Sequence, residues 1–126
     1  MAGLSPRELE RLVSFKGYGN LEADYWFIGW EEHVERDRDM LEDLKIRSAW
    51  PDIADLYEAN ESLGTVLDHY VPTWSVMIRI LLRLKGSPDW FGGRVVRTCQ
   101  NEQLGRHGGE TFLAEVLPLP SPSIAD

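Results

Sequence analysis

The chain has 126 residues, of which 43% are hydrophobic and 27% are charged, and this composition excludes a chain that is disordered throughout. A net charge of −8 argues against tight, sequence-independent binding to nucleic acid, which depends on lysine and arginine contacts to phosphates. A single cysteine, Cys99, excludes an internal disulfide and predicts a reduced, cytoplasmic environment. The longest apolar stretch, 76–84, contains two arginines, so we expect no membrane span, and the N-terminus predicts no signal peptide.

The first predicted element is a helix that begins after Ser5. Serine is a good N-cap, Pro6 suits the first turn, and Glu8 completes a capping box. Leu9, Leu12 and Val13 then follow at helical spacing, and the glycine-rich segment 17–20 is expected to end the helix in a tight turn.

The strongest strand signal is the run 23–28, Ala-Asp-Tyr-Trp-Phe-Ile, which Gly29 ends. Its apolar residues are continuous rather than alternating. That pattern is typical of a strand buried on both faces, as in a parallel sheet covered by helices.

Apolar spacing and breakers predict helices over 31–48, 52–63, 73–85 and 93–100. The helix over 73–85 has apolar residues around most of its circumference, which indicates deep packing. The run 111–117 is a second strand, and a proline-rich loop follows it.

Alternation of helices and strands predicts an α/β fold, with a parallel sheet flanked by helices. Two strands are too few for a stable sheet, so we expect residues 1–126 to form a single domain that is incomplete at its C-terminus. The alternative is a small helical domain with a minimal sheet.

Ligands of open α/β sheets bind at the carboxyl ends of the parallel strands, which here are followed by two loops. The first loop supplies a glycine for close approach, an aromatic face, two carboxylates and an imidazole: Gly29, Trp30, Glu31, Glu32 and His33. The second supplies Pro118, Pro120 and Ser121. The alternative for the two glutamates is that they complement a helix dipole, and for His33 that it is exposed or caps the helix.

Three further groups of residues could have a function. Gly17 and Gly19 could let Tyr18 project into the same crevice, with Asn20 as a hydrogen-bonding group; the alternative is a plain turn. Cys99 is expected to be a buried small hydrophobe, and Trp26, Trp50, Trp74 and Trp90 to be packing residues. Five basic residues could form a local groove or a solvated helix face: Arg79, Arg83, Lys85, Arg94 and Arg97.

The segments Gly17-Tyr18-Gly19-Asn20 and 23–32 resemble the N-terminal part of the uracil-DNA glycosylase-like superfamily, closest to its uncharacterised bacterial and phage members. The run 111–120, Thr-Phe-Leu-Ala-Glu-Val-Leu-Pro-Leu-Pro, resembles the second core strand and its loop in that group. The resemblance implies a three-layer α/β/α fold, and it implies that Glu31 or Glu32 is the residue that activates water.

A glycosylase-like protein would hydrolyse the N-glycosidic bond of an altered base that is flipped out of DNA. Trp30 or Tyr18 would stack on the base, and Glu31 would position water. Glu32 stands where the family has a proline, and this departure favours the alternative of an inactive module that binds nucleic acid or a nucleotide. A third hypothesis is a metal-dependent phosphoesterase that uses Glu31 or His33. We expect no metal and no cofactor.

Overall fold

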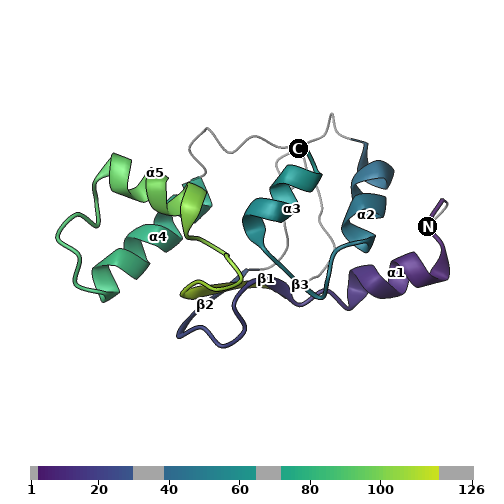
Figure 1. Cartoon of the computed structure of the whole chain (residues 1–126), viewed down its shortest axis with the longest axis horizontal. Coiled ribbons are helices and arrows are strands. Elements are labelled where there is room, and N and C mark those ends of the chain that lie inside the picture. Colours follow the sequence, from purple (N-terminus) through teal and green to yellow (C-terminus); the bar gives the residue numbers. More distant parts are fainter. Residues whose placement is uncertain (1–2, 30–38, 65–71, 117–126) are drawn as a thin grey trace.

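A computed structural model gives the structure of the chain, and it describes residues 3–29, 39–64 and 72–116. The elements in chain order are α1 (Pro6–Val13), β1 (Gly17–Gly19), β2 (Tyr25–Gly29), α2 (Met40–Ser48), β3 (Ile53–Ala54), α3 (Leu56–Ser62), α4 (Pro72–Leu84), α5 (Gly93–Glu102) and β4 (Thr111–Glu115). The predicted α/β class is confirmed (Figure 1).

The four described strands form one sheet in the order β2-β4-β1-β3. β2 runs parallel to β4 and β1 runs parallel to β3, but β1 and β4 are antiparallel. The expectation of a purely parallel sheet is therefore wrong. The reason is the short connection between β1 and β2: Ala23 N donates to Asn20 O at 3.0 Å, and this turn reverses the chain before β2 begins.

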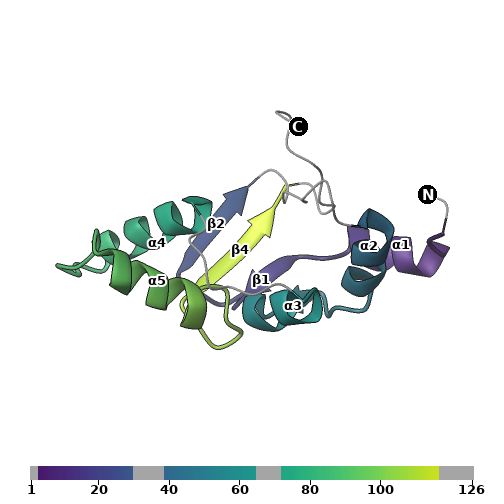
Figure 2. The ribbon, with the colours of Figure 1, turned by 90° about the horizontal axis from the view of Figure 1, so that it is seen from above.

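The described helices α2 to α5 lie on one face of this sheet, and α1 lies at one end (Figures 1 and 2). The three-layer arrangement that the resemblance implied is not seen in these residues. The hydrophobic core lies between the sheet and the helices and comprises Tyr18, Ala54, Leu56, Ala59, Ile78, Val96, Cys99, Leu104 and Leu113.

The burial of β2 differs from the sequence prediction. Its side chains alternate between half-buried and exposed, and Trp26 and Ile28 are 48% and 66% exposed. The described helices cover one face only, so Phe27 packs against the core while its neighbours face away from it. The prediction that this strand is buried on both faces is wrong for the described part of the chain.

The predicted N-terminal helix is confirmed together with its capping box. Glu8 N donates to Ser5 Oγ at 3.1 Å, and Ser5 N donates to Glu8 Oε1 at 2.9 Å. The helix packs against α2, and Arg11 Nε donates to Ser48 O at 2.9 Å. The local cap and this long-range contact together fix α1 at the end of the sheet.

The other predicted helices are present with shifted bounds. The described part of the helix predicted over 31–48 is α2, capped by Asp39. The segment 52–63 divides into β3 and α3, because Asp55 caps α3 with bonds from Tyr57 N and Glu58 N. Helices α4 and α5 match the predicted 73–85 and 93–100 within two residues.

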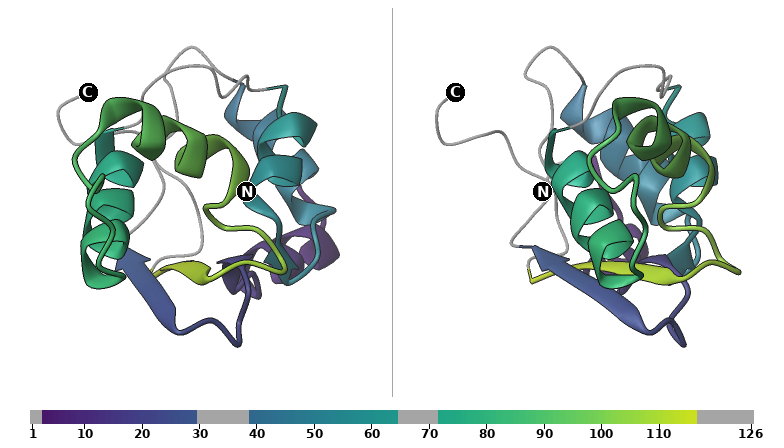
Figure 3. Two further views of the ribbon diagram at one scale, coloured as in Figure 1. Left: turned by 60° about the vertical axis from the view of Figure 1, so that its left-hand side comes forward. Right: turned by 90° about the vertical axis from the view of Figure 1, so that its left-hand side faces the viewer.

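Deep packing of α4 is confirmed on one side only. Ile78 and Leu81 are buried, whereas Val76, Ile80 and Leu84 are exposed. Helix α4 lies between the sheet and α5, so its remaining side faces solvent (Figure 3). Among the described helices, none is long and apolar enough to cross a membrane.

Candidate functional site

The two strands whose following loops were predicted to form the site, β2 and β4, are neighbours in the sheet. β2 and β4 are parallel, and Gly29 is paired with Glu115 at their carboxyl ends. Val116 N donates to Gly29 O at 2.7 Å, which ties the two ends together. The strands thus end side by side at one edge of the sheet (Figure 2).

The residues of the two loops lie outside the described part of the chain. Their predicted roles therefore stay predictions; the residues are Trp30, Glu31, Glu32, His33, Pro118, Pro120 and Ser121. What the structure adds is the position from which both loops depart, namely the paired ends of β2 and β4.

Glu115 is a residue at this edge that the sequence analysis did not single out. Its carboxylate lies over Gly29: a Cβ atom built on Gly29 would be 2.5 Å from Glu115 Oε2. The glycine therefore leaves room for a carboxylate at the ends of two parallel strands. The signal in the sequence was an acidic residue at the end of an otherwise apolar strand, Phe-Leu-Ala-Glu, which the strand prediction treated as one more strand residue.

The segment predicted as a turn, 17–20, is a strand in its first three residues. Gly17, Tyr18 and Gly19 form β1, and the turn begins at Asn20. Gly19 has φ +116, and its Cα lies so close to β4 that an added Cβ would meet Thr111 O. Glycine is thus required here for the close pairing of two strands.

Tyr18 and Asn20 both have structural partners in the described chain. Tyr18 is 6% exposed, and its ring contacts those of Phe15 and Trp50, with centroids 5.1 and 6.0 Å apart. Asn20 Nδ2 donates to Gly109 O at 2.9 Å. Because Asn20 N also donates to Thr111 O, Asn20 lies at the amino end of β4, away from the edge that holds Glu115.

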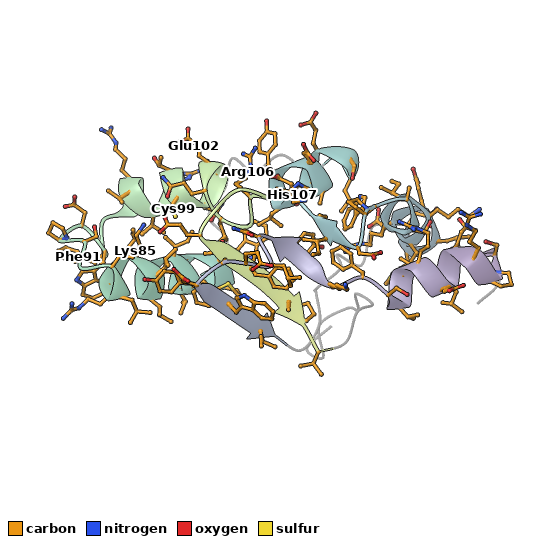
Figure 4. The ribbon with its side chains drawn as sticks, turned by 60° about the horizontal axis from the view of Figure 1, so that its bottom comes forward. Lys85, Phe91, Cys99, Glu102, Arg106 and His107 are labelled. Carbon is orange, nitrogen blue, oxygen red and sulfur yellow. The ribbon has the colours of Figure 1, made fainter. Side chains whose placement is uncertain are left out.

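A pocket of about 470 Å³ lies beside the C-terminal end of α5 and is lined by Cys99, Glu102, Arg106 and Thr111 among others. Figure 4 shows Cys99 together with Lys85, Glu102 and Arg106. Cys99 is 3% exposed, and its burial raises the pKa of the thiol. The prediction of a buried small hydrophobe is confirmed, and the raised pKa argues against a nucleophile because the thiolate is the reactive form.

Asp55 anchors the loop that borders this pocket. Its Oδ2 accepts from Arg106 Nε at 2.9 Å and from His107 N at 3.2 Å, and its Oδ1 accepts from Tyr57 N at 3.0 Å. His107 Nε2 lies 3.0 Å from Ile53 O, so its ring is held at β3 rather than beside Cys99 (Figure 4). This cluster fixes the position of the loop that carries Arg106 and His107.

The basic residues that could form a groove have different partners and positions in the structure. Arg79 Nη1 donates to Phe91 O at 2.7 Å, and Lys85 Nζ lies 2.6 Å from Glu110 Oε1. Arg94 and Arg97 line a second pocket, of about 550 Å³, along α5. The described part of the chain holds no cluster of three or more His, Cys, Asp or Glu that could bind a metal ion.

The four tryptophans that were predicted to be packing residues all contact other side chains, but only two of them pack against the core. Trp50 and Trp74 pack against the core. Trp26 is 48% exposed, although its ring lies 4.8 Å from that of Phe112 between centroids. Trp90 is 37% exposed in the connection between α4 and α5.

No family model matches this chain, and comparisons with curated proteins and with solved structures find no significant match.

Proposed function

We propose that this chain is a uracil-DNA glycosylase-like protein that hydrolyses the N-glycosidic bond of an altered base in DNA, at the carboxyl ends of β2 and β4. The observation that carries the proposal is the parallel pairing of these two strands, with Gly29 opposite Glu115. Two parallel neighbours that end together start both following segments from one edge, which is where α/β folds bind their ligands.

In this proposal Glu31 orients a water molecule toward the sugar carbon of a flipped nucleotide. The water oxygen forms a bond to that carbon, the bond to the base breaks, and the base leaves with the bonding electrons and takes up a proton. Positive charge develops on the sugar in the transition state. The carboxylate of Glu115, at the same edge, stabilises that charge electrostatically.

Trp30 is the aromatic residue that stacks on the base in this proposal. Tyr18, the other candidate, packs in the core against Phe15 and Trp50 and has its hydroxyl 3.3 Å from Arg47 Nη1. It supports the sheet beneath the site.

A second candidate function is a module that binds nucleic acid or a nucleotide without catalysing a reaction, and separate observations favour it. The sequence carries a net charge of −8, and Glu32 stands in place of the proline of the active family pattern. This function keeps the same edge of the sheet as the binding site.

The test is base release by the purified protein from single- and double-stranded DNA that carries uracil or other altered bases, at low salt. We expect release from at least one substrate and loss of release in Glu31→Gln. Glu22→Gln is the matched control, because Glu22 is exposed in the turn at the opposite end of the sheet. No release from a folded protein that still binds the oligonucleotides would contradict the enzyme and support the binding module.

Glu115→Gln tests the second carboxylate. We expect its kcat to fall about tenfold with KM unchanged, because about 1.4 kcal/mol of transition-state stabilisation is lost. An unchanged kcat would remove Glu115 from the proposed site without affecting Glu31.

A further inference from the structure

Helix α5 has two different faces. Val96, Cys99 and Gln100 are buried, with 1%, 3% and 2% exposure. The opposite face carries Arg94, Arg97, Thr98 and Asn101, whose spacing of three, four and seven residues places them in one stripe. We call this set the α5 polar stripe; it lines the pocket of about 550 Å³.

The stripe lies on an accessible part of the molecule. Helix α5 is on the outer side of the helical layer, farther from the sheet than α4 (Figure 3). Arg94, Arg97 and Thr98 are exposed, and Asn101 is half-buried. An extended ligand could therefore lie along the helix without displacing the core.

Several other cationic side chains are bound to partners within the described chain. Arg106 is bonded to Asp55, Lys85 to Glu110, and Arg11 to Ser48 O and Trp50 O. Within the described residues, neither Arg94 nor Arg97 forms an ion pair. Among the described residues that line the pocket, Glu102 alone is acidic, and it lies eight positions beyond Arg94.

Two guanidinium groups one turn apart repel each other, and an anion between them removes that cost. The stripe also includes the hydroxyl of Thr98 and the side-chain amide of Asn101. The Oδ1 atom of Asn101 accepts from Gln100 Nε2 at 3.5 Å. Over seven residues the stripe spans about 10 Å, which is the axial length of about three nucleotides in one strand.

We propose that the α5 polar stripe binds the phosphate backbone of a single DNA strand, with Arg94 and Arg97 each contacting a phosphate. Two arginines one turn apart suit a ligand that carries more than one negative charge, and the choice of DNA rests on the proposed function. The stripe gives this acidic protein a local cationic surface that adds affinity for the strand on which the proposed site acts.

The experiment measures the affinity for an undamaged single-stranded oligonucleotide as a function of salt. Two phosphate contacts predict a slope of about −1.4 in log K against log salt, so that affinity falls about sevenfold from 50 to 200 mM salt. Arg94→Gln/Arg97→Gln should bind at least about fivefold more weakly at 50 mM salt and lose most of this slope. Arg94→Lys/Arg97→Lys should keep the slope, because the charges remain.

The matched control is Arg7→Gln/Lys16→Gln, which removes the same charge from exposed residues near α1. It should bind with the wild-type slope. Near-ultraviolet circular dichroism checks that each variant is folded. Equal slopes for wild type and Arg94→Gln/Arg97→Gln, or no binding by the wild type at low salt, would overturn the proposal.

The two proposals fail separately. If the stripe binds DNA in a salt-dependent way but no base is released, the proposed binding surface stands and the proposed enzymatic function is wrong. If Arg94→Gln/Arg97→Gln releases the base with the wild-type KM and the wild-type salt dependence, the proposed enzymatic function stands and the proposed binding surface is wrong.

Discussion

Asp55 shows how one side chain organises the loop next to the pocket at Cys99. Burial raises the pKa of its carboxyl group, but hydrogen bonds from the backbone of His107 and Glu58 and from the Arg106 guanidinium outweigh burial, so the pKa lies below its ordinary value. The carboxylate caps α3 and holds residues 106 and 107 at the same time. Its charged form is thus the one that stabilises the fold.

We predict that Asp55→Asn lowers the free energy of unfolding by about 2 kcal/mol at pH 7, because charge-assisted hydrogen bonds are lost. A carboxyl whose folded-state pKa is lowered stabilises the protein fully above its unfolded-state pKa of about 4, and this stabilisation disappears as the pH falls through the folded-state pKa. Urea unfolding at several pH values should therefore show a gap between wild type and variant that is constant near neutrality and shrinks below about pH 4.

Asp52→Asn is the control, because Asp52 is exposed, and a change within about 0.5 kcal/mol is expected. If the gap between wild type and Asp55→Asn did not shrink in acid, the ionised form of Asp55 would not be the stabilising one.

At the scale of elements, β1 is the part of the sheet that is hardest to predict from the sequence. Two of its three residues are glycines, which are poor in strands and common in turns. Long-range pairing makes this segment a strand, because Tyr18 is paired with Ala54 on one side and with Leu113 on the other. A local pattern cannot report such contacts, and the same holds for the two-residue strand β3.

Gly19→Ala should destabilise the protein by about 3 kcal/mol or more. The residue would have to adopt a positive φ, and its Cβ would meet the backbone oxygen of Thr111, which cannot move without breaking the pairing of β1 and β4. Thermal or urea unfolding measures the loss.

Gly93→Ala is the comparison, because a Cβ at the start of α5 would have no described atom within 4 Å and alanine favours helix. We expect a change of less than about 1 kcal/mol, toward higher stability. Similar losses in both variants would mean that β1 does not approach β4 closely in solution.

Elements with strong local signals were predicted well. The capping box of Ser5 and Glu8 and the glycine that follows α4, Gly86 with φ +76, depend on neighbouring residues only. The sequence predicted both strands, 23–28 and 111–117, but their adjacency in the sheet is seen only in the structure. Glu115 could not be found in this way, since its approach to Gly29 depends on the register between strands that are 86 positions apart.

At the scale of the whole molecule, the helices of the described chain cover a single face of the sheet. The uninterrupted apolar run in β2 predicted burial on both faces, yet Trp26 and Ile28 face away from the helices. Apolar continuity reports the tendency of a strand to be buried, whereas the number of layers depends on which elements are available to cover it. Ile28 and Leu113 therefore sit in opposite environments although they are isomers.

This contrast gives a prediction for the two-layer arrangement. Leu113→Ala should lower the free energy of unfolding by about 2–5 kcal/mol, because Leu113 is 5% exposed and its loss leaves a cavity between sheet and helices. Ile28→Ala should cost less than about 1 kcal/mol, because Ile28 is 66% exposed and truncation opens no cavity. Denaturant unfolding of both variants at one protein concentration compares them. If Ile28→Ala lowered the free energy of unfolding as much as Leu113→Ala, the outer face of β2 would be covered in solution. The sequence prediction that β2 is buried on both faces would then be correct.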